Sequence, residues 1–279
     1  MKRSTTLLIT ALLAGAGAAA AFARQEEKPN APIKEVKKEP EAPAKPATHD
    51  KAIEILKKVD AATRAVQAVR YKGTVTRTGG AGASALSIEG TAIISGEFGG
   101  SYQKFRFDVK VKTAESEEVK RFTVGGDGDI YYLIDWQNKI AYEDLDPAVV
   151  GSDGDAARRL GMVEFIHPKP FSDEINAQRA ELKESVKIGG EDCYVIDVTY
   201  AGGSGRSIWY FSKKDFLPRR RDQVFTRPGR PESTIERVIT DLVVDPKLDD
   251  AMFKLDLPEG FKKTDEFAPS RRRLRPSPQ

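Results

Sequence analysis

The sequence predicts a mainly β protein with a smaller helical part, in which about eleven antiparallel strands curl into a barrel or half-barrel. Aromatic and β-branched runs alternate with tight turns, as where Ser207-Ile208-Trp209-Tyr210-Phe211 precedes the turn Lys213-Lys214-Asp215. This order favours an antiparallel meander over a nucleotide-binding α/β sheet. A flat sheet rarely holds so many strands, so we expect this one to curl.

Residues 1–23 have the three parts of a secretory signal peptide. Lys2 and Arg3 are basic, residues 7–21 are apolar, and Ala21-Phe22-Ala23 has the small residues of a cleavage site. An uncleaved membrane anchor is the alternative, but the apolar run is shorter than the ~20 residues that span a bilayer. No cysteine directly follows Ala23, so the chain has no acceptor for a lipoprotein anchor. We therefore expect cleavage after Ala23 and a soluble protein in the periplasm.

The segments next to both ends lack the bulky apolar residues that a core needs. Residues 24–49 are rich in Pro, Lys, Glu and Ala, and residues 267–279 are rich in Arg and Pro. We expect both to be disordered, as a tether and a tail. Residues 50–266 then form one domain, within the size range of a single β sandwich or barrel.

Charge and cysteine content limit the classes of partner. The net charge of +3 is small for 279 residues and does not favour nucleic-acid binding, which usually needs a concentrated basic face. The arginine tail can touch anionic lipid headgroups transiently, although a merely solvated terminus is the alternative. Cys193 is the single cysteine, so we expect no intramolecular disulfide and a monomer that its own core stabilises.

One amphipathic helix precedes the strands. Its apolar positions recur at spacings of three and four residues, at Ala52, Ile55, Val59, Ala62, Val66 and Val69. Asp50 is the expected N-cap.

The strands are expected at residues 71–78, 86–97, 102–112, 118–125, 129–135, 139–145, 181–188, 191–200, 206–212, 217–226 and 233–244. The long interruption 146–179 contains three candidate helix starts, at Asp146-Pro147, Asp155 and Ser172. We expect short helices there that cover one open mouth of the barrel.

Alternation within one strand suggests where a ligand would lie. Phe105, Phe107 and Val109 share one face, while Lys104 and Arg106 share the other. Such an apolar face either packs on the helices as an ordinary core or receives a ligand, and the sequence leaves both possibilities open.

The sequence offers little material for catalysis. His49 and His167 are the only histidines, and His49 falls in the expected tether, so a histidine metal site or catalytic triad is not supported. Cys193 with His167 is a possible nucleophile pair, but a thiol within an apolar strand is expected to be buried and inert. Asp127-Gly128-Asp129 lacks the further ligands of a calcium loop and predicts a hairpin turn. We expect no enzyme, no metal and no cofactor.

Local motifs recur in the order seen in a known family. They are Lys104-Phe105-Arg106, the turn Asp127-Gly128-Asp129 before Ile130-Tyr131-Tyr132, Trp209, Leu217-Pro218, and the ending Asp249, Phe253 and Pro258-Glu259-Gly260. In this order, residues 50–266 resemble the periplasmic lipoprotein carrier LolA and its relatives, which include lipid-binding proteins and sigma-factor regulators. The resemblance implies an incomplete antiparallel β-barrel with an N-terminal helix and a helical lid.

The resemblance also implies a function and a site. It implies a periplasmic binding or carrier protein of the cell envelope for a lipid, an acyl chain or a lipoprotein bound for the outer membrane. The alternative is a periplasmic sensor or structural protein of the same fold that binds a protein partner. The cavity residues expected are Ile55, Val59, Val66, Phe105, Phe107, Val109 and Trp209. The carrier's Arg-Pro before its basic strand, which holds the lid closed, has no counterpart here, where Gly99-Gly100 stands.

Overall fold

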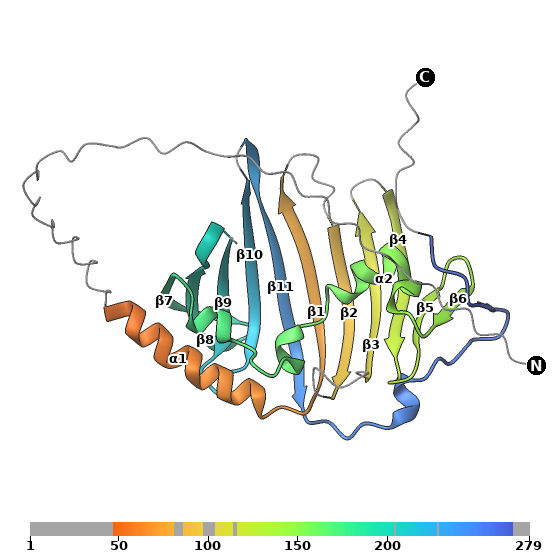
Figure 1. Cartoon of the computed structure of the whole chain (residues 1–279), viewed down its shortest axis with the longest axis horizontal. Coiled ribbons are helices and arrows are strands. Elements are labelled where there is room, and N and C mark those ends of the chain that lie inside the picture. The colour runs from red at the N-terminus through yellow and green to blue at the C-terminus, as the bar shows by residue number, and fades with distance from the viewer. Residues whose placement is uncertain are drawn as a thin grey trace, which may run out of the picture. The chain divides into compact units, whose positions relative to one another are not determined.

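The strands form a single open sheet, which Figure 1 shows from the side that the helices cover. The strands are β1 (Ala68–Gly79), β2 (Leu86–Ser95), β3 (Lys104–Thr113), β4 (Ser116–Gly126), β5 (Tyr131–Asp135), β6 (Ile140–Asp144), β7 (Arg179–Ile188), β8 (Glu191–Thr199), β9 (Arg206–Ser212), β10 (Pro218–Arg227), β11 (Arg230–Val244) and β12 (Lys262–Thr264). Their order is β12-β6-β5-β4-β3-β2-β1-β11-β10-β9-β8-β7. Since β12 and β7 are unpaired edges, the barrel is incomplete, as predicted.

This computed structural model describes residues 47–80, 86–96, 104–113, 116–203, 205–227 and 229–269. They all belong to the compact unit Ala44–Gln279. The expected signal peptide, most of the expected tether and the tail from residue 270 lie outside the described residues.

The eleven predicted strands are all present, and they pair antiparallel with one another. β12 was not predicted. It is three residues long, has no apolar alternation, and pairs in parallel with β6, so no local pattern marks it. The open sheet with a leading helix is the architecture that the resemblance to LolA implied.

Helix α1 (Ala47–Arg64) begins and ends earlier than predicted. Asp50 lies within its first turn and is not the N-cap. Val66 and Val69 were assigned to this helix, but Val66 follows it and Val69 belongs to β1. The helical spacing continued by coincidence into the alternation of β1, where β-branched residues favour extended backbone.

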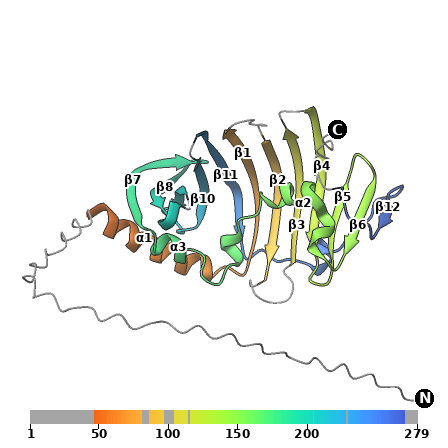
Figure 2. The same cartoon turned by 45° about the horizontal axis from the view of Figure 1, so that its top comes forward.

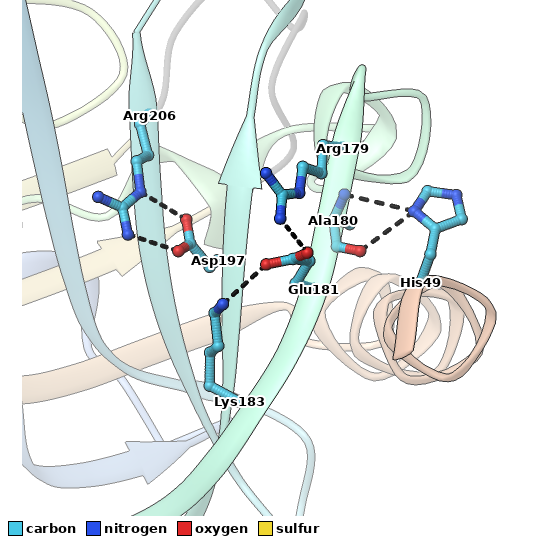
Figure 3. Close-up of polar contacts among 7 residues, drawn as sticks. All are labelled: His49, Arg179, Ala180, Glu181, Lys183, Asp197 and Arg206. Atoms are coloured by element: carbon cyan, nitrogen blue, oxygen red, sulfur yellow. Dashed lines mark hydrogen bonds and ion pairs between the residues drawn. The ribbon is translucent and has the colours of Figure 1, made fainter. Parts of the chain in front are cut away.

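His49 corrects the predicted end of the tether. It is buried in the first turn of α1, with its Nδ1 3.1 Å from the carbonyl oxygen of Ala180 on β7 (Figure 3). The contact fastens the start of α1 to the edge strand of the sheet.

The interruption between β6 and β7 forms a lid, which we define as residues 147–175. It contains the 3-10 turn η1 (Pro147–Val150), helix α2 (Gly151–Arg158), the 3-10 turn η2 (Val163–Ile166) and the short helix α3 (Ser172–Ile175). Asp146 caps η1 as predicted, because its side chain accepts a hydrogen bond of 2.8 Å from the Ala148 amide. Asp155 lies inside α2 and Ser172 is the first residue of α3, so these two predicted caps are wrong.

The helices lie on one face of the sheet, here called the inner face, and the sheet curls around them at the β7–β10 end (Figure 2). One continuous apolar core joins the inner face to α1 and the lid. The outer face carries charged pairs, such as Asp197 with Arg206 and Glu181 with Lys183 (Figure 3).

A second, smaller core lies on the outer face. Tyr132, Ile134 and Ala141 of β5 and β6 are covered by Leu255, Leu257 and Phe261 of the segment that leads to β12, together with Trp136. We call residues 250–261 the outer strap. The chain then returns to the lid, where the Ala268 amide donates to the Val149 carbonyl at 2.9 Å. Ala268 is buried, so the predicted start of the tail at residue 267 is too early.

Candidate binding face

The centre of the apolar part of the inner face is formed by three residues of β3, here called the β3 row: Phe105, Phe107 and Val109. Phe107 and Val109 are buried, with Phe107 only 5% exposed, and Phe105 is half-buried at the edge of the core. The rings of Phe105 and Phe107 have centroids 5.3 Å apart. Neighbouring strands add Ile88, Ala92 and Ile94 from β2, Phe122 and Val124 from β4 and Leu133 from β5.

The lid covers this row closely. Helix α2 packs on β3 and β4, and the chain after it brings Gly161 against the Phe107 ring. A Cβ atom at Gly161 would lie 2.8 Å from Cζ of Phe107, so a larger residue here would require the ring to shift. The predicted row is therefore packed against the lid in this structure.

Tyr71 of β1 fastens the same part of the lid to the sheet. Its hydroxyl donates to the Leu160 carbonyl at 2.9 Å and accepts from the Met162 amide at 2.9 Å. Burial raises the pKa of Tyr71 well above its ordinary value, so the hydroxyl keeps its proton and its donor role. This single side chain satisfies two backbone groups of the lid.

The structure divides the predicted cavity residues into two groups. The β3 row lies under α2, whereas α1, which carries Ile55 and Val59, packs mainly on β7, α3 and η2. Ile55 and Val59 are buried there. Trp209 of β9 is fully buried and contacts Phe171 edge-on, with ring centroids 5.1 Å apart. Both groups belong to one continuous core.

Val66 lies elsewhere, in a pocket of about 670 Å³ beside η2. The turn after α1, the end of β2 and residues 165–168 line this pocket. The Thr63 hydroxyl at its border is buried and has no hydrogen-bond partner within the described chain. A further groove of about 510 Å³ lies on the outer face over β11, β1, β2 and β3, lined by Lys72, Glu89 and Lys110 among others.

Sequence reasoning missed a polar cluster on the inner face of β9–β11. The strand register places Trp209 opposite Arg221 and Arg221 opposite Arg237. Glu164 of η2 meets them from the lid, with its Oε1 3.0 Å from Nη1 of Arg221. The Arg221 guanidinium carbon lies 4.5 Å from the centre of the Trp209 ring. We call Glu164, Trp209, Arg221 and Arg237 the arginine site.

Groups around the arginine site have shifted pKa values. Burial raises the pKa of Glu174 of α3, although its Oε1 accepts a 2.6 Å hydrogen bond from the Tyr200 hydroxyl. Burial, with Glu174 nearby, raises the pKa of Tyr200 to about 12. Burial lowers the pKa of Arg237, whose Nε donates to the Arg159 carbonyl at 2.7 Å.

The remaining sequence candidates have structural surroundings. Cys193 is buried in β8, and burial raises the pKa of its thiol. Asp127 accepts hydrogen bonds from the amides of Asp129 and Ile130, which confirms the predicted turn. Within the described residues, no three His, Cys, Asp or Glu side chains gather as a metal site would need. None of the described helices has the length and apolar character needed to cross a membrane.

The sequence matches no protein-family model, and a search of curated proteins finds no match. Among solved structures, the chain is similar to LprF from Mycobacterium bovis, at 11% identity over 74% of this chain and 97% of that one, with a TM-score of 0.47. A LolA superfamily protein from Nitrosomonas europaea matches at 12% identity over 73% of this chain and 97% of that one, with a TM-score of 0.29. A chain of the Pseudomonas aeruginosa MucA/MucB complex matches at 13% identity over 74% of this chain and 61% of that one, with a TM-score of 0.39. These likenesses concern the arrangement of strands and identify no ligand.

Proposed function

We propose that this chain is a periplasmic binding or carrier protein for a lipid, an acyl chain or the acylated end of a lipoprotein. The ligand would lie on the inner face of the sheet, between the strands and the lid, against Phe105, Phe107 and Val109. The structure then represents the closed, ligand-free form, in which lid side chains fill the space that the acyl chain takes. On this proposal the protein binds its ligand and performs no catalysis.

The observation that carries this proposal is the way the lid covers the inner face. The cover consists of short helical pieces, and single side chains of the sheet fasten them: Tyr71 to Leu160 and Met162, Arg221 to Glu164, Arg237 to the Arg159 carbonyl, and Tyr200, after β8, to Glu174. Asp60 of α1 adds one contact, accepting from the Phe171 amide at 3.2 Å. Short elements held by few contacts are the parts of a protein that open at low cost in free energy.

The pocket beside η2 gives the chain a route under the lid. It is bordered by Phe165 and Ile166 of η2, next to Glu164, and by Val66, which follows α1. A displacement of η2 would join this pocket to the apolar inner face. An acyl chain would replace contacts between apolar side chains with contacts of the same kind, so exchange requires little net loss of buried apolar area.

Titration of detergent-free protein with a fluorescent fatty acid tests the proposal, with native mass spectrometry of protein purified from the envelope as the second readout. We expect saturable binding of one chain per protein and a co-purified lipid mass. Co-purification of a stoichiometric protein, with no fatty-acid binding, would instead support the sensor or structural function.

A further inference from the structure

The arginine site is incompletely paired, although Glu164 and Trp209 are buried in it and Arg221 is largely enclosed. The side chain of Arg221 is 16% exposed and that of Glu164 is 8% exposed. Glu164 uses one oxygen for Arg221, while its Oε2 has no hydrogen-bond partner among the residues that the structure describes. The indole N–H of Trp209 is likewise buried and without a partner there. A buried donor and a buried acceptor that both lack a partner cost free energy and call for an explanation.

Arg221 also has unused donor capacity. Beyond Glu164, its Nε and Nη2 lie 3.4 Å from the Ser207 hydroxyl, at the long end of hydrogen-bonding distance. A guanidinium presents a planar fork that binds a carboxylate or phosphate through two parallel hydrogen bonds. Glu164 engages only one nitrogen, Nη1, so the fork is not filled by its present partner.

A purely structural ion pair does not account for these features. An isolated buried pair adds little stability compared with apolar side chains of similar volume. Here Arg221 and Arg237 face the interior side by side on adjacent strands. Their positive charges repel each other when no anion is present. Glu174 is the other carboxylate of this region, and Tyr200 already engages it. Glu164 is the carboxylate that contacts Arg221 directly.

We propose that the arginine site binds the oxyanion of an amphiphilic ligand, a carboxylate or phosphate at the end of an acyl chain, and that Glu164 occupies it as an internal substitute in the closed form. The inference rests on the proposed carrier function and specifies the ligand's polar end. The ligand's oxyanion takes the Arg221 fork and the Trp209 N–H, Glu164 leaves with η2, and the acyl chain lies on the apolar strands. One anion replaces another, so the buried charge stays balanced.

Three ligands of one chain length test the inference by isothermal titration calorimetry at neutral pH: dodecanoate, dodecyl phosphate and dodecanol. We expect both anions to bind at least about tenfold more tightly than the alcohol, since hydrogen bonds to charged groups contribute this much. Acetate and inorganic phosphate alone should not displace dodecanoate at equal concentration. Equal affinity for dodecanol and dodecanoate, or displacement by inorganic phosphate, would overturn the inference.

Variants of adjacent residues provide matched controls. Glu164→Gln removes the internal anion and keeps its shape, so dodecanoate should bind about tenfold more tightly and dodecanol about equally. Arg221→Met should abolish the preference for anions. Arg220 and Glu236 form the corresponding pair on the outer face, 2.6 Å apart, so Arg220→Met and Glu236→Gln should leave the preference unchanged.

The outcomes separate the two proposals. A protein that binds neither dodecanol nor the anions contradicts the carrier function itself. A protein that binds all three with similar affinity, unaffected by Glu164→Gln, remains a carrier but has no oxyanion site. If Arg221→Met fails to fold, the wild-type preference and the Glu164→Gln effect still decide the matter.

Discussion

The two halves of the inner face are built on opposite principles, although one lid covers both. Under α2, strands β2–β5 present apolar side chains, and Phe107 lies directly against Gly161. Under η2 and α3, strands β9–β11 present Arg221 and Arg237 to Glu164, next to aromatic rings. Apolar packing joins the lid to the first half, and an ion pair joins it to the second.

Under the proposed carrier function, this difference would let one cover be both stable and removable. Apolar packing is non-directional, so a ligand chain can substitute for it. A buried ion pair is directional and leaves uncompensated charge when one partner is removed. Under the proposed function, the apolar half would supply a surface for a chain, and the charged half would determine which ligand releases the lid.

Phe107→Ala gives the largest expected effect and tests the apolar half. Because the ring is buried between β3 and Gly161, we expect a loss of roughly 3–5 kcal/mol in the free energy of unfolding, measured with urea. Phe105→Ala, at a half-buried position, is the control and should cost less. A loss for Phe107→Ala well below that range would show that the ring borders open space.

Arg221→Met tests the charged half. We expect it to cost on the order of 3 kcal/mol, since Glu164 remains buried without its cation. Replacing both partners, as Glu164→Leu with Arg221→Met, should recover most of this loss, because an apolar pair needs no compensation. If the double variant is no more stable than the single one in urea unfolding, the ion pair is not what makes this half sensitive.

Tyr71→Phe tests the link between the halves. It leaves the Leu160 carbonyl and the Met162 amide without their partner, so we expect a loss of about 1–3 kcal/mol and faster uptake of a fluorescent fatty acid. Tyr132→Phe is the matched control, because its hydroxyl donates to the Phe253 carbonyl under the outer strap, at 2.9 Å. It should lower stability without speeding uptake, and equal acceleration by both variants would exclude a specific role for Tyr71.

Glu174→Gln has the smallest expected effect, and it depends on pH. Burial raises the folded pKa of Glu174, so its favourable contribution is present at low pH and is lost as the pH rises from the ordinary glutamate pKa through the raised value. The variant should therefore melt at a higher temperature than wild type at neutral pH, and this difference should vanish in acid.

Glu181→Gln on the outer face should act in the opposite sense. Hydrogen bonds from Lys183 and Arg179 lower the pKa of Glu181 (Figure 3), so its contribution is present above the ordinary glutamate pKa and is lost as the pH falls through the lowered value. A thermal-melting series across pH measures both variants. Shifts of the same sign would contradict the assignment of Glu174 to a buried site and of Glu181 to the charged outer face.

Local patterns were sufficient to predict the strands, because alternation and turn residues report directly on a half-buried sheet. They predicted the apolar β3 row for the same reason. They failed at Val66 and Val69, where the helical spacing of α1 runs into the alternation of β1. They also failed at β12, which is a strand only because it pairs with the distant β6. His49 was misassigned because the residues before it carry no helical pattern, while its contact with Ala180 comes from distant sequence.

The arginine site could not be predicted from any one strand. Arg221 is the last of three consecutive arginines. Of the other two, Arg220 pairs with Glu236 on the outer face, and Arg219 pairs with Asp215 at the start of the strand. Only the register of β9, β10 and β11 places Arg221 beside Trp209 and Arg237. The one available signal would have been the register of the hairpin that follows Trp209. Pairing its two strands outward from the turn places Arg221 opposite Trp209. The partner Glu164 comes from the lid, whose position depends on tertiary packing.

The most direct test of the account follows two backbone amides by hydrogen exchange in NMR, with and without saturating dodecanoate. The Met162 amide donates to Tyr71 under the lid, and the Lys262 amide donates to the Lys139 carbonyl at the end of the outer strap. If the lid opens to admit a chain, ligand should change the exchange rate of Met162 and leave that of Lys262 unaltered. Saturable binding with no change at Met162, or with equal changes at both amides, would contradict a ligand site beneath the lid.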